Sequence, residues 1–328
     1  LSYLLHQCPD FLTLGCYRHF GLTLQSDRPL ARLVESSELP VDLFVSTREA
    51  DHQRSLPWVE RPDNTGVSRA CTDDGTWLRL RYAGAGGWAE FVINPNGSTV
   101  GVSTSRQVLW EEVCELLLGA VFSCVLAQRG LTCLHAGVVQ IGRSAIGFVG
   151  AKGSGKSTLV LALVQRGAIL VSDDVALLGE LNNRPAVTVG SPRLRVGRDS
   201  AEVLCGSYDS LQPMWVFEEG RPAKRYVEVP SARAGTQVKL DALYLLDPFG
   251  QGVAQPSSRR LRAVEAIPRL MAYRHMVEVM EHQNDRRDFA VLGWTAASVG
   301  IYALVRADGL RGVTSTADAL LADLSVRA

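Results

Sequence analysis

The stretch GAKGSGKS at residues 150–157 decides the fold. It matches the pattern G-x-x-x-x-G-K-[ST], and it lies between an apolar run at 144–149 and a helical pattern at 156–166. Glycines let such a loop turn so that its backbone N–H groups point at phosphate oxygens, and the helix start adds positive charge. The ammonium of Lys156 can reach the β- and γ-phosphates, and the hydroxyl of Ser157 can ligate magnesium. The nucleotide-binding residues predicted from this pattern are Gly150, Ala151, Lys152, Gly153, Ser154, Gly155, Lys156, Ser157 and Thr158.

Around this loop, apolar runs typical of strands alternate with helical patterns. The pattern predicts strands at 134–141, 144–149, 168–172, 186–189, 238–246 and 301–305. It predicts helices at 156–166, at 263–281 with a kink near Pro268, and at 317–326. This alternation indicates an α/β nucleotide-binding domain over residues 131–328.

The part of the chain before this domain has a different pattern. Residues 77–82 and 88–93 alternate apolar and polar side chains, which is typical of strands, and a turn signal follows at 94–97. Residues 40–75 are polar and are interpreted as a long loop. We therefore expect a β-rich N-terminal domain at 1–105, joined to the rest by a helix within 106–130 that stops at Gly130.

Composition and charge exclude several classes of protein. The chain has 328 residues, which suggests about two domains. Lys+Arg and Asp+Glu both number 34, so a protein that binds nucleic acid or coats a membrane is not expected. The seven cysteines include no C-x-x-C pair, which favours reduced thiols over disulfides or a zinc site. The apolar run at 116–127 is too short to span a bilayer, and no signal peptide is expected, so we predict a cytoplasmic protein.

Asp173 and Asp174 follow the strand at 168–172, one helix and one strand after Lys156. A phosphate-binding loop needs a carboxylate for its metal ion at this place. Neighbouring side chains on a strand point to opposite faces, so the two carboxylates should have different tasks. One can hold magnesium or its water, and the other can accept the proton of an attacking hydroxyl. The alternative is a solvated acidic turn.

His135 is a further candidate catalytic residue, on the strand that precedes the loop. If this strand pairs antiparallel with 144–149, His135 lies at the loop end of the sheet. There it could donate a hydrogen bond to an aspartate or a phosphate. The alternative is a histidine with a structural role.

Four basic residues are candidate contacts for the acceptor or a phosphate. Arg193 and Arg195 would share one face of a strand, and Lys224 and Arg225 precede another strand. The alternative for all four is a solvated or ion-paired surface. His275, His282 and the charged run DRRD at 285–288 are interpreted as a polar helix face and a turn without a function.

The chain resembles the catalytic core of the HPr kinase/phosphorylase superfamily. The resemblance extends from residue 135 to 174, and its motifs are His135-Ala136-Gly137, the loop 150–157, Arg166-Gly167 and the run LVSDD at 170–174. It implies a kinase core related to PEP carboxykinase that uses ATP and Mg²⁺ to phosphorylate a serine hydroxyl. By the same resemblance Asp173 would be the acid/base for the serine proton, Ser157 would ligate the metal, and Asp174 would lie near His135 and the metal.

Some motifs depart from the members that modify HPr. Thr158 stands where those members usually carry Glu, the Glu-x-Arg-Gly signature has no clear copy, and residues 1–105 differ from their N-terminal domain. The chain is more similar to stand-alone HPr-kinase-like proteins that accompany peptide or natural-product biosynthesis. A serine of a protein or peptide is therefore the expected acceptor, and a homo-oligomer is implied by the resemblance alone. The alternatives are a small-molecule hydroxyl kinase and a nucleotide-binding regulatory protein with little transfer activity.

Overall fold

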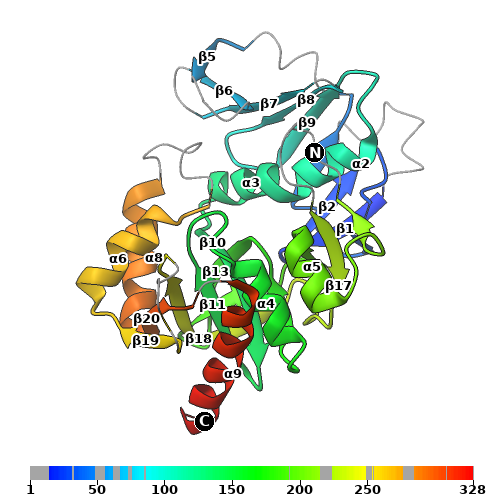
Figure 1. Ribbon diagram of the computed structural model, residues 1–328. Coiled ribbons are helices and arrows are strands. Elements are labelled where there is room, and N and C mark those ends of the chain that lie inside the picture. The colour runs from blue at the N-terminus through cyan, green and yellow to red at the C-terminus, as the bar shows by residue number, and fades with distance from the viewer. Residues whose placement is uncertain are drawn as a thin grey trace. The chain divides into compact units, whose positions relative to one another are not determined.

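Figure 1 shows the protein as a computed structural model, in which the chain divides into two compact units. Among the described residues, the first unit runs to Val121 and the second begins at Phe122. The described residues are 15–31, 33–48, 56–61, 67–72, 76–84, 86–191, 193–214, 224–248, 253, 255–275, 284–307 and 309–327.

A mixed β-sheet forms most of the first unit. Its strand order within the described residues is β3-β1-β2-β4-β9-β8-β7-β6-β5. The two alternating runs predicted from the sequence form β7 and β8, which pair antiparallel with Leu78 opposite Ile93. The strands are β1 Gly15–His19, β2 Leu22–Ser26, β3 Val34–Glu35, β4 Leu43–Ser46, β5 Trp58–Arg61, β6 Val67–Thr72, β7 Leu78–Gly84, β8 Gly87–Ile93 and β9 Thr99–Thr104.

The prediction of a long loop over residues 40–75 is wrong. The described part of that stretch contains β4, β5 and β6. β4 pairs in parallel with both β2 and β9, and its Leu43 and Val45 are buried. Four residues are too few to establish a two-residue period, so the polar residues around β4 dominated the pattern.

A helical segment follows β9, where the sequence predicted one, but it begins later than residue 106. It consists of α2 Trp110–Leu116, the π-helical turn η2 Leu117–Val121 and α3 Phe122–Gln128. Gly130 has a left-handed φ of 79°, which fits its predicted role as a helix stop. Among the helices that the structure describes, none combines the length and the apolar content that a membrane crossing needs.

The second unit is a mixed α/β fold whose main sheet closes on itself. β11 pairs with β10 on one side and with β18 on the other, so the order β11-β10-β13-β14-β18 forms a ring. β20 and β19 continue outward from β18, and β12 pairs with β10. The strands of this sheet are β10 Cys133–Ile141, β11 Ser144–Val149, β12 Ile169–Ser172, β13 Val175–Leu181, β14 Arg184–Thr188, β18 Gln237–Leu246, β19 Ser257–Arg260 and β20 Gly300–Val305. All six strands predicted for this part of the chain are thereby confirmed.

A small separate sheet and a set of helices complete the second unit. The small sheet has the order β15-β17-β16. Its strands are β15 Arg193–Val196, β16 Gln212–Pro213 and β17 Arg225–Glu228, and the helices after α3 include α4 Lys156–Val164, α5 Arg198–Cys205, α6 Ala263–Ala272, α8 Asp285–Ser298 and α9 Gly309–Arg327.

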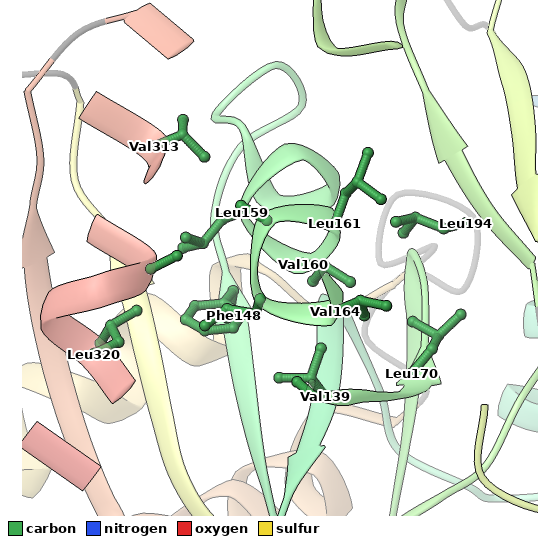
Figure 2. Close-up of a cluster of buried hydrophobic side chains, with 14 of the residues drawn as sticks. Val139, Phe148, Leu159, Val160, Leu161, Val164, Leu170, Leu194, Val313 and Leu320 are labelled. Atoms are coloured by element: carbon green, nitrogen blue, oxygen red, sulfur yellow. The ribbon is translucent and has the colours of Figure 1, made fainter. Parts of the chain in front are cut away.

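Helix α4 is the centre of one hydrophobic core (Figure 2). Every residue from Leu159 to Val164 is buried, so the helix has no solvent-facing side. Side chains of β10, β11, β12, β15 and α9 surround it, among them Phe148, Leu194 and Leu320. A helix that is apolar all round belongs inside a protein, which explains why α4 lacks an amphipathic pattern.

Two predictions near the C-terminus need correction. The helix expected at 263–281 ends as α6 at Ala272, with Pro268 inside it, and residues 276–283, which include His282, lie outside the described residues. The charged run 285–288 is not a turn but the start of α8, with Asp285 and Asp288 in its first turn. Acidic side chains in a first helical turn are stabilised by the helix dipole, and the sequence interpretation did not weigh this.

His19 gives the first unit a pH-dependent stability. Its ring is buried, and Nε2 donates to the carbonyl oxygen of Leu118 at 3.1 Å. Burial lowers the pKa of His19 to about 4, although the hydrogen bond to Leu118 opposes this shift. The unfolded chain therefore binds a proton near the ordinary pKa of 6.5, whereas the folded unit binds it only near pH 4.

We predict that the first unit loses about 3 kcal/mol of unfolding free energy as the pH falls from 6.5 to 4 through this one group. His19→Gln keeps an amide donor for Leu118 and does not titrate, so this variant should lose less stability over the same range. Urea unfolding followed by tryptophan fluorescence measures the difference, because Trp58, Trp77, Trp88 and Trp110 lie in this unit. Parallel pH profiles for the two proteins would contradict the prediction.

Candidate functional site

The candidate site lies where three parallel strands end. β11, β18 and β20 run side by side, with Val149 opposite Leu245 and Leu246 opposite Leu304. The loop 150–155 leaves the end of β11 and leads directly into α4 at Lys156. Ligands of open α/β sheets commonly bind at this carboxyl edge.

The loop conformation depends on its glycines. Gly155, the residue before the first turn of α4, has a left-handed φ of 82°, which side-chain-bearing residues rarely adopt. A Cβ on Gly150 would lie 2.8 Å from Ser154 Oγ and 3.2 Å from Leu246 Cβ. The Oγ of Ser154 is itself buried, and no described residue forms a hydrogen bond with it.

Lys156 is folded over this loop. Its ammonium donates to the carbonyl oxygens of Gly150 at 2.7 Å and Ala151 at 3.0 Å. Burial lowers the pKa of Lys156 to about 8; Asp174 and Asp173 oppose this shift, and the charges of Lys224 and Arg306 add to it. Several cations therefore share one small region around the loop.

Asp173 joins the start of α4 to strand β15 of the small sheet. Its Oδ1 accepts a hydrogen bond from Ser157 Oγ at 2.9 Å. Its Oδ2 accepts one from the backbone N–H of Arg195 at 3.0 Å, and the Nε of Arg195 lies 3.4 Å away. The side chain is only 4% exposed. Asp173 is thus a buried carboxylate beside the hydroxyl of the loop.

Asp174 faces a different set of partners. His135 Nε2 lies 3.0 Å from its Oδ1, and Arg195 Nη2 donates to its Oδ2 at 2.8 Å. Burial alone would raise the pKa of Asp174, but Arg195, His135 and His275 together hold the pKa well below its usual range. The side chain is 35% exposed, and its backbone adopts a left-handed φ of 73°. Such backbone strain occurs most often at functional sites.

The antiparallel pairing that would bring His135 to the loop end is present. Ala136 lies opposite Val149, so His135 comes directly beyond the last residue of β11. Of the sequence candidates, the structure thus brings together the loop, Lys156, Ser157, Asp173, Asp174, His135 and Arg195.

Three other candidates point elsewhere. The Oγ1 of Thr158 lies 2.9 Å from Ser200 Oγ on α5. Arg193 donates to Gln212 Oε1 at 3.2 Å. Arg225 donates to the carbonyl oxygen of Leu211 and stacks over Tyr208. Lys152 and Lys224 are exposed.

Sequence analysis missed His275 at this site. It was interpreted as part of a polar helix face, but it follows the end of α6, and its backbone N–H donates to the carbonyl oxygen of Cys133 on β10. Its ring centroid lies 5.7 Å from that of His135, and its buried Nδ1 has no hydrogen-bond partner among the residues that the structure describes. Burial lowers the pKa of His275 to about 4, with Asp174 opposing. No sequence spacing could have revealed this contact, because it joins two segments that are distant in the chain.

Comparisons with known proteins give little further information. No family model matches the chain, and no curated protein matches it. The HPr(Ser) kinase/phosphatase from Coxiella burnetii is a similar solved structure, with a TM-score of 0.32 and 15% sequence identity over 60% of this chain and 97% of that chain. At this level the likeness assigns neither a family nor an activity.

Arg195 should matter far more for stability than Arg193, although both side chains are 20% exposed and lie on the same strand. Arg195→Met leaves the carboxylates of Asp173 and Asp174 without their shared counter-ion, which should cost about 3 kcal/mol. Arg193→Met removes a hydrogen bond to Gln212, a 4.0 Å ion pair with the exposed Glu228 and a contact with the ring of Tyr226, and should cost less than about 1 kcal/mol. Urea denaturation of both variants measures the two free energies. Equal losses would show that Arg195 does not neutralise the aspartates.

Proposed function

We propose that the protein is an ATP- and Mg²⁺-dependent kinase that transfers the γ-phosphate to a serine or similar hydroxyl of a protein or peptide. The observation that carries this proposal is the hydrogen bond between Ser157 and Asp173 at the start of α4. It joins a hydroxyl and a carboxylate next to a glycine-rich loop over which Lys156 is folded. This combination is what phosphoryl transfer from a nucleotide requires.

The loop offers donors that a triphosphate would satisfy. Within the described ranges the buried hydroxyl of Ser154 has no hydrogen-bond partner, and an unpaired buried donor is costly. Burial is the main cause of the lowered pKa of Lys156, and the positive charges of Lys224 and Arg306 lie close enough to add to it. A bound polyanion would relieve this repulsion, and it would draw the ammonium of Lys156 from the loop carbonyls to the phosphates.

The residues present fit a magnesium ion. Ser157 and Asp173 would hold it, since both present hard oxygen atoms at the loop. Within the described ranges, no three His, Cys, Asp or Glu side chains are grouped to hold a metal alone. This agrees with magnesium, which usually takes one or two carboxylates together with phosphate oxygens and water. The ion would neutralise charge that develops on the transferred phosphate.

The contacts favour an exchange of the roles expected for the two aspartates. The side chain of Asp173 is buried and touches Ser157, whereas that of Asp174 is 35% exposed and is oriented by His135. We therefore assign the metal side to Asp173 and the acceptor side to Asp174. The acceptor oxygen forms a bond to the γ-phosphorus, the bond from this phosphorus to the bridging oxygen breaks, and ADP leaves. The hydroxyl proton goes to the carboxylate of Asp174.

Lys156→Ala should weaken nucleotide binding by about 100-fold or more, because two charge-assisted contacts to phosphate are lost. Lys239→Ala is the control, since this lysine pairs with Asp241 on β18 and is partly exposed. Titration with a fluorescent ATP analogue measures both affinities. Undiminished binding by Lys156→Ala would refute the phosphate-loop assignment.

The pair Asp174→Asn and Asp173→Asn tests the division of roles. Asp174→Asn should cut transfer by about 100-fold with nearly unchanged ATP affinity, because only the proton acceptor is lost. Asp173→Asn should instead raise the magnesium concentration needed for half-maximal nucleotide binding. If Asp173→Asn leaves the magnesium requirement unchanged and Asp174→Asn raises it, the assignment must be reversed.

The acceptor is tested by incubating the protein with ATP labelled at the γ-phosphate and a set of peptides and metabolites. Mass spectrometry then identifies the labelled species. A labelled serine supports the proposal, and a labelled metabolite supports the small-molecule alternative. Nucleotide binding without any labelled product supports a regulatory protein.

A further inference from the structure

Arg306 is the largest fully buried side chain in the described part of the chain. It directly follows β20, and only 1% of it is exposed. Burying a charged side chain is costly unless its donors are satisfied. Neither the glycine-rich motif nor the aspartate pair pointed to this residue, and the proposed reaction does not yet use it.

The guanidinium of Arg306 joins the loop to the neighbouring strand. Its Nη1 donates to the carbonyl oxygen of Ser154 at 2.7 Å, and its Nη2 donates to that of Asp247 at 3.1 Å. Asp247 directly follows β18, which lies between β11 and β20 in the parallel part of the sheet. Arg306 thus reaches from the end of β20, across the end of β18, to the loop that follows β11.

The bond to Ser154 determines where the next amide points. In a trans peptide the C=O and N–H groups point in opposite directions. When Arg306 holds the carbonyl of Ser154 on its own side, the N–H of Gly155 must point in the opposite direction within the same peptide plane, away from Arg306. Loops of this type bind phosphate through such N–H groups. The left-handed φ of Gly155 belongs to the same conformation.

Arg306 also contributes charge. Burial lowers the pKa of Arg306 to about 10, with Asp247 opposing, so the side chain stays positive at neutral pH. Its field reaches the ammonium of Lys156. A fixed cation behind the loop stabilises an anion in front of it, and the effect is large because the surroundings are buried.

We propose that Arg306 is a positioning residue for nucleotide binding, which aligns the Gly155 amide toward the phosphate chain. This inference rests on the proposed function. Arg306 would act through the loop without touching the nucleotide. Its removal should therefore weaken the binding of phosphates and leave the recognition of the nucleoside unchanged.

The test compares Arg306→Lys and Arg306→Gln with the unsubstituted protein. Affinities for ATP, ADP and adenosine are measured by competition against a fluorescent ATP analogue, and thermal unfolding of each protein is recorded. Arg306→Gln should weaken ATP binding by about tenfold or more, because a charge-assisted hydrogen bond is lost. Arg306→Lys keeps the charge and one donor and should recover part of the loss. Adenosine should bind all variants equally, and the KM for ATP should rise more than kcat falls.

Arg166→Lys is the matched control. This arginine also donates to two backbone carbonyls, those of Ala162 and Thr314, but it lies at the far end of α4 from the loop. The Arg166→Lys substitution should leave the ATP affinity within about twofold of that of the unsubstituted protein, whatever its effect on stability. An equal loss of ATP affinity in this control would overturn the inference, because general destabilisation would then explain the effect.

Further outcomes separate this inference from the proposed function. If the unsubstituted protein binds no nucleotide, both fail. If it binds ATP and Arg306→Gln binds equally well, or if adenosine loses as much affinity as ATP, only the role of Arg306 fails. Should neither variant fold, hydrogen exchange on the unsubstituted protein decides. Saturating ATP should slow the exchange of the Gly155 amide, and an unchanged rate would overturn the inference.

Discussion

The burial of every α4 residue from Leu159 to Val164 is the constraint on which the candidate site depends. These residues pack against strands, another helix and the small sheet at once. β10 approaches so closely that a Cβ on Gly137 would lie 2.8 Å from a methyl group of Val160. Rotation of the helix would bring these apolar side chains into conflict with their neighbours, since interiors are close-packed. The direction in which Lys156 and Ser157 point is therefore set by the core beneath them.

On this fixed helix start, the site balances charges that come from distant parts of the chain. The two aspartates follow β12, Arg195 lies on the small sheet, and His135 lies on β10. Arg195 binds both aspartates, so it holds the negative charges together in a partly buried place. Arg306 ties the loop down in a similar way, because it binds the carbonyl oxygen of Ser154 in the loop and that of Asp247 at the end of β18. Two arginines thus hold the site together. Arg195 joins β15 to the aspartates that follow β12, and Arg306 joins the end of β20 to the loop that follows β11.

Local patterns predicted what depends on neighbours in sequence. The strands around the loop, α4 itself and the antiparallel pairing of His135 follow from runs long enough to show a period. β4 was missed because four residues between polar neighbours show no period, and its place comes from pairing with β2 and β9. His275 and Arg306 were missed for another reason. Each reaches the site through a contact far along the chain, and one sequence contains no signal for such a contact.

The closed ring of β11, β10, β13, β14 and β18 has a consequence for how the second unit comes apart. In an open sheet a terminal strand can peel away and leave a single new edge. In a ring, separation of any one strand breaks two ladders of backbone hydrogen bonds and exposes two edges at once. Partial opening is therefore expensive at every strand. The ring should melt as one cooperative body, and local fraying should be confined to β12, β19 and the loops outside it.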